Sequence, residues 1–386
     1  MAPCLVCAEN DTVAFLDADS VPVQCTEMFA TREAARAAPV GEMRLVLCRR
    51  CSAVTNSGFD PELVPYEGDY ENSQLFSGSF RAWASDLAQR LVKDHGLAGS
   101  PVVEVGSGKG EFLAMLAEAG AGRATGYDPT YEGEIDHLDG LDVHLVRTMF
   151  DSSTVTGDVG LVCSRHVLEH LVDPVEMLSG IRSAVDTSPR CALYVEVPNS
   201  AFTFTESGVW DVIYQHCTYF SSVSLEWAAR AAGFRVTSVE PSFGGQFLSL
   251  EAIADGETGT PEDLKDRADS TAAELARFVP GYGSIIEGWR DRIASWKGSG
   301  KRIALWGGGA KGVTFLTLAG QGVDTVIDVN PRKHGRFLPG TGHEVAPAES
   351  LAEAGVDVVV IMNGAYESEI RADLKEMGLE PEVAVV

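Results

Sequence analysis

The sequence of 386 residues contains no long run of apolar residues. Its longest apolar stretches, such as Val358–Met362, are far shorter than the roughly 18 or more residues that a membrane-spanning helix needs. The first residues, MAPCLVCAEN, have neither a charged n-region nor a long apolar h-region, so a secretory signal peptide is not expected. These absences predict a soluble, cytoplasmic protein that does not contact membranes.

Basic residues are scarce relative to acidic ones. The chain has 30 Lys and Arg against 56 Asp and Glu, which gives a formal net charge of −26. Binding to nucleic acid requires a basic face, and attachment to an anionic membrane surface requires a polybasic patch. Neither is expected, so the predicted partner is a small molecule. The apolar content of 45% excludes a wholly disordered chain, and the length suggests two to three domains at roughly 150 residues each.

Four of the eight cysteines form two Cys-x-x-Cys pairs, Cys4/Cys7 and Cys48/Cys51. In a cytosolic chain such pairs favour zinc over disulfides. Four thiolates would fill a tetrahedral site, so the predicted Zn²⁺ is structural. The intervening loop exceeds the usual length of roughly 15–20 residues, and Cys25 within it is a competing ligand. Residues 1–72 are therefore expected to be an irregular zinc-binding module that the metal stabilises.

The rest of the chain alternates between predicted helices and strands, which is typical of parallel α/β sheets. A helix is expected over 73–95. Strands are expected over 101–105, 123–127, 143–146, 160–163 and 192–197, and two further β-like runs over 235–239 and 247–252. A linker over 254–262 separates this domain, residues 73–254, from a smaller one, residues 255–386. The smaller domain is expected to begin with two helices broken at Pro280 and to continue as a second α/β unit from residue 302.

Residues 102–110 (VVEVGSGKG) predict a strand that ends in a glycine-rich turn and opens a helix. Such glycines let the backbone approach a ligand, and the helix start offers unpaired N–H groups. A dinucleotide site uses G-x-G-x-x-G, whereas this spacing is tighter and Glu104 would repel a phosphate. S-adenosylmethionine, with its sulfonium and ammonium groups, fits better.

Asp128 ends the next strand about 20 residues later, where an acid can accept both ribose hydroxyls. Residues 147–150 are positioned to line the adenine. The predicted cofactor-binding residues are Glu104, Gly106, Ser107, Gly108, Gly110, Asp128, Met149 and Phe150. The alternative is that the loop is only a tight turn between a strand and a helix.

Two segments supply histidines. Residues 164–170 (SRHVLEH) match the H-x-x-E-H pattern of zinc proteases, but they leave a strand in mid-domain and no third acidic ligand is evident. Either one histidine packs beneath the cofactor loop, or His170 faces a substrate at the carboxyl end of the sheet. In residues 211–220, His216 is a candidate general base, and Tyr214 could polarise a carbonyl. Alternatively, the aromatic residues of that segment only close the core.

A second glycine loop reads G-x-G-x-x-G at Gly307, Gly309 and Gly312, and Asp328 ends the following strand. This is a dinucleotide fingerprint, so a nicotinamide-dependent oxidoreductase is a competing hypothesis. Lys311 inside the loop is unusual for that function. A substrate-binding or vestigial Rossmann-like unit is the other interpretation.

With these motifs in this order, the chain resembles the sugar C-methyltransferases of deoxysugar biosynthesis. The matching marks are the two cysteine pairs and the segments EVGSGKGEF, VLEHLVDP, IYQHCTYFS and WGGGAKG. The resemblance covers nearly the whole chain. It implies an α/β fold with an N-terminal zinc module, a central class I S-adenosylmethionine-dependent methyltransferase domain and a C-terminal Rossmann-like domain.

The resemblance also implies an activity, the methylation of carbon 3 of a thymidine-diphosphate 4-keto sugar through an enolate. The base of the family falls on His216, its other histidine on His170 and its tyrosine before the first helix on Tyr70. The acidic neighbour of the base is Gln215 here, and the segment around Tyr214 matches only after a one-residue shift. O- or N-methylation of a sugar or another natural product, the oxidoreductase, and a non-catalytic zinc-stabilised scaffold remain as alternatives.

Overall fold

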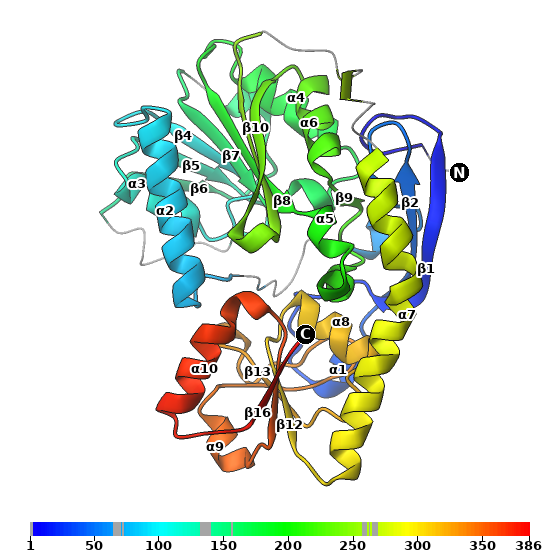
Figure 1. Cartoon of the computed structure of the whole chain (residues 1–386). Helices are drawn as coiled ribbons and strands as arrows, with labels where there is room; N and C mark the ends of the chain where they lie inside the picture. Colours follow the sequence, from blue (N-terminus) through cyan, green and yellow to red (C-terminus); the bar gives the residue numbers. More distant parts are fainter. Residues whose placement is uncertain are drawn as a thin grey trace.

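The computed structural model describes residues 3–64, 71, 73–131, 140–155, 157–256, 261, 263–264 and 269–386. The described strands form a seven-stranded, a five-stranded and a four-stranded sheet. In Figure 1 the seven-stranded sheet occupies the upper half of the molecule and the five-stranded sheet the lower half, while the four-stranded sheet lies beside the upper one. No helix in the described part of the chain has the length and hydropathy needed to span a membrane.

The seven-stranded sheet has the strand order β10-β11-β8-β7-β4-β5-β6. Neighbouring strands from β8 to β6 are parallel, whereas β11 runs antiparallel to both β8 and β10. Its strands are β4 (Val102–Val105), β5 (Ala124–Tyr127), β6 (Val143–Val146), β7 (Leu161–Arg165), β8 (Ala192–Pro198), β10 (Arg235–Ser242) and β11 (Phe247–Ile253). The α/β class predicted from the sequence is confirmed.

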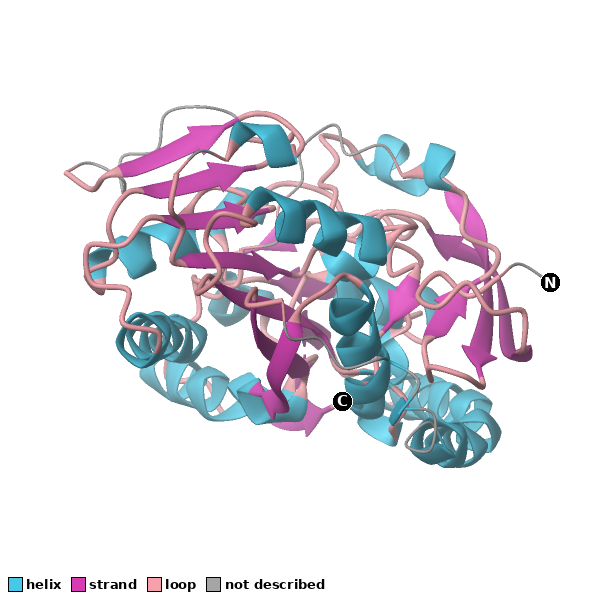
Figure 2. Cartoon of the chain, turned by 90° about the horizontal axis from the view of Figure 1, so that it is seen from above, coloured by secondary structure: helices cyan, strands magenta, loops and turns pink. Residues whose placement is uncertain are grey.

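Helices cover both faces of this sheet, as the view from above shows (Figure 2). Alternate residues of β4 point to opposite faces, so Val102 packs with α2 (Gly78–Asp94) and α3 (Glu111–Glu118), while Val103 packs with α4 (Pro174–Ala184) and α6 (Ser222–Ala231). Burial on both faces explains why these strands read as continuous apolar runs. The short helix α5 (Ser200–Thr203) follows β8.

The N-terminal region forms an antiparallel sheet of order β1-β2-β3-β9, so the expectation of an irregular module was wrong. Its strands are β1 (Thr12–Pro22), β2 (Val40–Cys48), β3 (Val54–Asn56) and β9 (Thr218–Tyr219), and α1 (Arg32–Arg36) lies between β1 and β2. The sheet is stable because alternate β2 residues, such as Met43 and Leu45, join a core shared with the C-terminal half. Its last strand comes from the segment that follows His216, which sequence patterning could not reveal.

The five-stranded sheet is parallel throughout, in the order β14-β13-β12-β15-β16. Its elements are β12 (Ile303–Trp306), α8 (Ala310–Leu318), β13 (Thr325–Ile327), β14 (Val345–Ala346), α9 (Ser350–Ala354), β15 (Val358–Ile361), α10 (Glu367–Glu376) and β16 (Glu382–Val385).

Helix α7 (Asp269–Gly298) is continuous and contains Pro280, so the predicted break into two helices was wrong. A proline inside a helix costs about 3 kcal/mol. Phe278 before the proline and Ile286, Ile293 and Trp296 after it all bury in one core. Since each buried large side chain contributes roughly 1.5–3 kcal/mol, this packing outweighs the cost of the proline. In Figure 1, α7 runs along one side of the molecule past both halves.

Candidate active site

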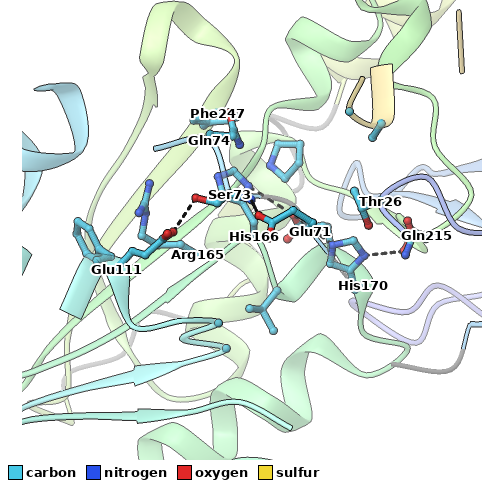
Figure 3. A pocket seen from close by; sticks show the side chains of 18 of the residues that line it. Thr26, Glu71, Ser73, Gln74, Glu111, Arg165, His166, His170, Gln215 and Phe247 are labelled. Atoms are coloured by element: carbon cyan, nitrogen blue, oxygen red, sulfur yellow. Dashed lines mark hydrogen bonds and ion pairs between the residues drawn. The ribbon is translucent and has the colours of Figure 1, made fainter. Parts of the chain in front are cut away.

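A cleft of about 1030 Å³ lies where the carboxyl ends of the parallel strands of two sheets meet. On one side it is lined by the turn after β4 and by the residues that follow β5 and β7; on the other it is lined by the turn after β12 and by residues after β13 and β15. Ligands of open α/β sheets bind in this position. Figure 3 shows a close view of the cleft, with His170 and Gln215 on one side and Arg165 and Glu111 on the other.

The first glycine loop has a conformation that needs glycine. Gly106, Gly108 and Gly110 have φ of +75°, +52° and +72°, a region that L-residues with a side chain rarely adopt. A Cβ at Gly106 would lie 2.2 Å from Cγ2 of Val167, and one at Gly110 would lie 2.9 Å from Cδ1 of Leu145. The backbone of this turn therefore comes close to the segment after β7, and the cleft opens directly above it.

Asp128, at the end of β5, is held against the glycine loop. Its Oδ2 accepts a hydrogen bond from the N–H of Gly108 at 2.7 Å, and its Oδ1 accepts from the N–H and hydroxyl of Thr130 at 2.8 and 2.6 Å. Met149 and Phe150 line the same end of the cleft. Phe150 packs edge-on against Tyr127, and Met149 is 64% exposed. These positions suit a ribose beside the acid and an adenine beside the two apolar side chains.

Glu104 is a buried acid on the floor of the cleft. Its Oε2 has no hydrogen-bond partner among the described residues, and the same holds for Oγ of Ser107. Burial raises the pKa of Glu104 to about 8; the charge of Arg165 opposes this shift and that of Asp128 adds to it. A buried carboxylate without a donor is costly, and an ammonium group in the cleft would supply one. The loop, Asp128 and Glu104 together thus fit S-adenosylmethionine.

His166 has the positive φ of +56°, which directs its ring into a buried group of charges. Its Nε2 lies 3.1 Å from Oε1 of Glu196, and its Nδ1 lies 3.6 Å from Oε1 of Glu169. Burial opposes a charge on this ring, but hydrogen bonding to Glu169 and Glu196 prevails and raises the pKa of His166 to about 9. His166 is therefore a cation at neutral pH, a role that the sequence did not indicate.

His170 and His216 lie together in the cleft, with ring centroids 5.1 Å apart. Nδ1 of His170 donates to the carbonyl oxygen of Gln215 at 2.9 Å, so its Nε2 carries the lone pair when the ring is neutral. Burial, and then the charge of His170, lower the pKa of His216 to about 3, although Glu169 acts in the opposite direction. His216 is therefore unprotonated at neutral pH.

Gln215 itself is fixed by the N-terminal sheet region, because its Oε1 accepts from the N–H of Cys25 at 3.0 Å.

The structure places Tyr214 outside the cleft lining, contrary to the prediction that it polarises a substrate carbonyl. Its hydroxyl accepts from the N–H of Asp60 at 2.9 Å and donates to the carbonyl of Gly58 at 3.4 Å. Its ring packs on Phe59 and fills the space over Gly41, where a Cβ would lie 2.4 Å from the ring. Of the other predicted residues, Gly110 starts α3 and does not line the cleft, and Tyr70 lies outside the described residues.

The four paired cysteines come together, with Sγ–Sγ distances of 3.6 Å for Cys4 and Cys51 and 3.5 Å for Cys7 and Cys48. All four sulfur atoms lie within 4.8 Å of one another. Tetrahedral coordination with bonds of about 2.3 Å places sulfur atoms roughly 3.8 Å apart, so this cluster could hold a metal ion. Cys25 is buried elsewhere, near the carbonyl of Pro22.

The second glycine loop differs from the first in its charge. Oδ2 of Asp328 accepts from the N–H of Gly308 at 2.9 Å, as Asp128 does at Gly108, but it is also paired with the buried Lys333 at 3.0 Å. A carboxylate neutralised in this way is a poorer acceptor for a ribose diol. Lys311 pairs with Asp211 of the central domain at 3.0 Å. This arrangement favours the substrate-binding interpretation of the loop over the nicotinamide one.

Comparison with known families agrees with the cofactor fit. Residues 75–239 match a family model described as a methyltransferase domain, and residues 266–380 match one described as a C-methyltransferase C-terminal domain. A search of curated proteins finds no match.

Several solved structures are similar. The chain is 17% identical to 1,6-didemethyltoxoflavin-N1-methyltransferase of Burkholderia thailandensis, over 52% of this chain and 95% of that one, with a TM-score of 0.35. It is 18% identical to magnesium protoporphyrin IX methyltransferase of Synechocystis PCC 6803, over 48% and 90%, with a TM-score of 0.36. It is 15% identical to an S-adenosylmethionine-dependent methyltransferase of Mesorhizobium loti, over 44% and 97%, with a TM-score of 0.36.

The matched domains span both walls of the cleft, and the central one contains the glycine loop, Glu104 and Asp128. The chain is an enzyme of the class I methyltransferase fold, an S-adenosylmethionine-dependent methyltransferase.

Proposed function

We propose that this methyltransferase transfers its methyl group to a ring carbon of a nucleotide-linked keto-deoxysugar. The observation that carries the proposal is that the domain matched as C-methyltransferase C-terminal lines the same cleft as the cofactor loop. A cleft of about 1030 Å³ exceeds the usual range of roughly 300–1,000 Å³ for a small-molecule site. It therefore has room for a cofactor together with a large acceptor. The resemblance to sugar C-methyltransferases supplies the substrate class.

The reaction needs a base, a group that holds the enolate oxygen, and proximity between the acceptor carbon and the methyl. When bound, S-adenosylmethionine supplies an electrophilic methyl on sulfur. His216, unprotonated in the cleft, removes the proton on the carbon next to the ketone. The electron pair of the broken C–H bond becomes the enolate, whose carbon would take the methyl that the bound cofactor supplies.

His170 is the group that we propose for the enolate oxygen. Its Nδ1 is tied to the carbonyl of Gln215, so its Nε2 is the ring nitrogen that is left for a substrate oxygen. Oε1 of Glu169 lies 4.0 Å from this Nε2. The carboxylate that the family has beside its base is replaced by Gln215, and Glu169 is the buried acid that remains near both histidines. Tyr70, which the resemblance implies, stays a prediction.

The cofactor would be held by Glu104 at its ammonium, by Asp128 at its ribose and by Met149 and Phe150 at its adenine. We also propose that the cysteine cluster binds a structural Zn²⁺. The site is closed because all four ligands are thiolates, so the metal has no open position for chemistry.

The test is methyl transfer from ¹³C-methyl S-adenosylmethionine to a thymidine-diphosphate 4-keto-deoxysugar, with NMR locating the label. Label on the carbon next to the ketone supports the proposal. Label on oxygen or nitrogen would instead establish the alternative, an O- or N-methyltransferase. No transfer despite tight cofactor binding would mean that the acceptor is a different molecule.

His216→Asn then tests the base. It should bind S-adenosylhomocysteine normally and lose about 100-fold or more in kcat, the usual contribution of a general base. His144→Asn is the matched control, because His144 lies on β6 and bonds to Asp142 at a half-exposed site. Full turnover in His216→Asn would remove His216 from the mechanism.

A further inference from the structure

Arg165, the last residue of β7, is a largely buried cation on the cleft wall. Only some of its N–H groups donate hydrogen bonds to Glu196. The side chain of Arg165 is 10% exposed. Its Nε and Nη2 both donate to Oε1 of Glu196, at 3.0 and 2.8 Å, and its guanidinium lies 4.3 Å from the ring centroid of Phe112. Arginine has five N–H donors, so Glu196 takes two of them. The stacking on Phe112 fixes the plane in which the remaining donors lie.

Glu104 lies on β4, the strand next to β7, and its carboxyl group lacks a hydrogen-bond donor at Oε2 among the residues that the structure describes. Strands β4 and β7 are parallel neighbours, with Glu104 opposite Cys163, two residues before Arg165. Among the described residues, Arg165 forms its ion pair with Glu196 and none with Glu104. Oε2 of Glu104 is buried and has no hydrogen-bond partner there either. An acid and a guanidinium thus lie side by side on the cleft wall without satisfying each other.

The charges around this pair are already balanced without Glu104. Arg165 and His166 are cations, and Glu196 and Glu169 are the carboxylates that balance them. Glu104 is therefore the surplus acid of the group. A ligand that brings one positive group to Glu104 and one negative group to Arg165 would give each of these two side chains a partner.

Arg165 and the proposed catalytic histidines lie on opposite sides of the cleft. In Figure 3 its side chain lies on the side of Glu111 and Ser73, while His170 lies on the side of Thr26 and Gln215. Ser73 donates to Glu111 at 2.7 Å and helps close this end of the cleft. Arg165 and Glu104 line the cleft together with Asp128 and the glycine loop, so a cofactor with its ribose at Asp128 could reach both with its amino-acid tail.

We propose that Arg165 and Glu104 form a clamp for the zwitterionic tail of the cofactor, in which Arg165 binds the α-carboxylate and Glu104 binds the α-ammonium. The proposal rests on the S-adenosylmethionine site and not on the identity of the acceptor. It assigns Arg165 a ligand, and it explains an arginine at this position of the SRHVLEH segment that the protease-like pattern left unexplained.

Calorimetry on the full chain tests the clamp with three ligands that differ in the charged groups of the amino-acid tail. They are S-adenosylhomocysteine, its decarboxylated analogue, which keeps only the ammonium, and 5′-methylthioadenosine, which keeps neither group. Arg165→Gln should weaken S-adenosylhomocysteine by about 10-fold or more, the usual value of a charge-assisted hydrogen bond, and leave the other two ligands unchanged. Glu104→Gln should weaken the first two ligands and leave methylthioadenosine unchanged.

Since Arg165→Gln removes one of the partners of the buried Glu196, the double variant Arg165→Gln/Glu196→Gln is compared with Glu196→Gln alone. The same selective loss is expected between those two. An equal loss for all three ligands, or unchanged binding of S-adenosylhomocysteine, would overturn the clamp. If the unmodified chain bound none of the three, the cofactor site itself would be wrong and the clamp would fail with it.

Discussion

A single added methyl group at Gly106 tests whether the cofactor loop works as described. In Gly106→Ala the new Cβ would lie 2.2 Å from Cγ2 of Val167, and the residue would keep a φ of +75°. The backbone strain costs roughly 1–2 kcal/mol, and forcing a methyl into a packed site costs roughly 1–3 kcal/mol. The loop will relieve this strain by moving away from its cofactor-binding conformation.

Binding must then restore the strained loop, so the affinity for S-adenosylhomocysteine should fall. The two costs together are roughly 2–5 kcal/mol, and the lower end corresponds to about a 30-fold weaker Kd. Calorimetry with S-adenosylhomocysteine measures the affinity, and urea unfolding measures the accompanying loss of stability.

Two controls separate the causes. Gly180, on α4 and also lining the cleft, has nothing within 4 Å of the position of a new Cβ, so Gly180→Ala should bind normally and gain about 0.5–1 kcal/mol of stability. In Gly106→Ala/Val167→Ala the clash is gone and only the strain at φ remains. If Gly106→Ala weakens S-adenosylhomocysteine binding less in the Val167→Ala background than in the unmodified protein, the clash contributes to the loss. Unchanged affinity in Gly106→Ala alone would refute the reasoning.

Three further outcomes are expected. Cys48→Ser should reduce the zinc content, measured by mass spectrometry, from one per chain and lower the thermal midpoint, whereas Cys25→Ser should keep the metal; equal zinc in both variants would refute the cluster. The folded pKa of His166, about 9, lies above its ordinary 6.5, so its stabilisation is complete below pH 6.5 and is lost as the pH rises through 9. The loss should approach roughly 3 kcal/mol, seen in urea unfolding at pH 7 and pH 10 and reduced in His166→Gln; equal falls in both proteins would contradict it. The imidazole NMR signals of His216, assigned with His216→Asn, should not titrate between pH 7 and 5, because its pKa of about 3 lies below that range; a midpoint near 6.5 would show that the ring is solvated.

The clamp and the base depend on different contacts, so their variants should separate in kinetics. Loss at Arg165 weakens binding of the cofactor, and loss at His216 lowers turnover at saturating cofactor. A His216→Asn variant that bound S-adenosylhomocysteine poorly would indicate that the ring supports the cleft instead of removing a proton.

Patterns contained within a few residues were sufficient to predict the conformation of the first glycine loop. Glycines at 106, 108 and 110 between an apolar run and a helix predicted a tight turn, and the structure has a positive φ at all three. The expected acid at the end of the next strand, Asp128, accepts a hydrogen bond from that turn. The cysteine pairs predicted a cluster for the same reason, since each Cys-x-x-Cys turn brings its own two thiols together. Backbone restrictions of this kind depend on neighbouring residues, so the sequence itself contains them.

The direction of side chains and their hydrogen-bond and ion-pair partners could not be predicted from local patterns, because they depend on contacts between distant segments. Tyr214 points into the N-terminal sheet because β9 pairs with β3, and no local pattern contains that pairing. Helix α7 continues through Pro280 because one core accepts residues from both of its halves. The charges of Arg165, His166 and Glu169 likewise follow from burial beside Glu196, a residue of another strand. Motifs within the sequence were therefore sufficient to indicate a methyltransferase. Only the packing of the three sheets decided which groups share the cleft, because burial and charge pairing are properties of the assembled core.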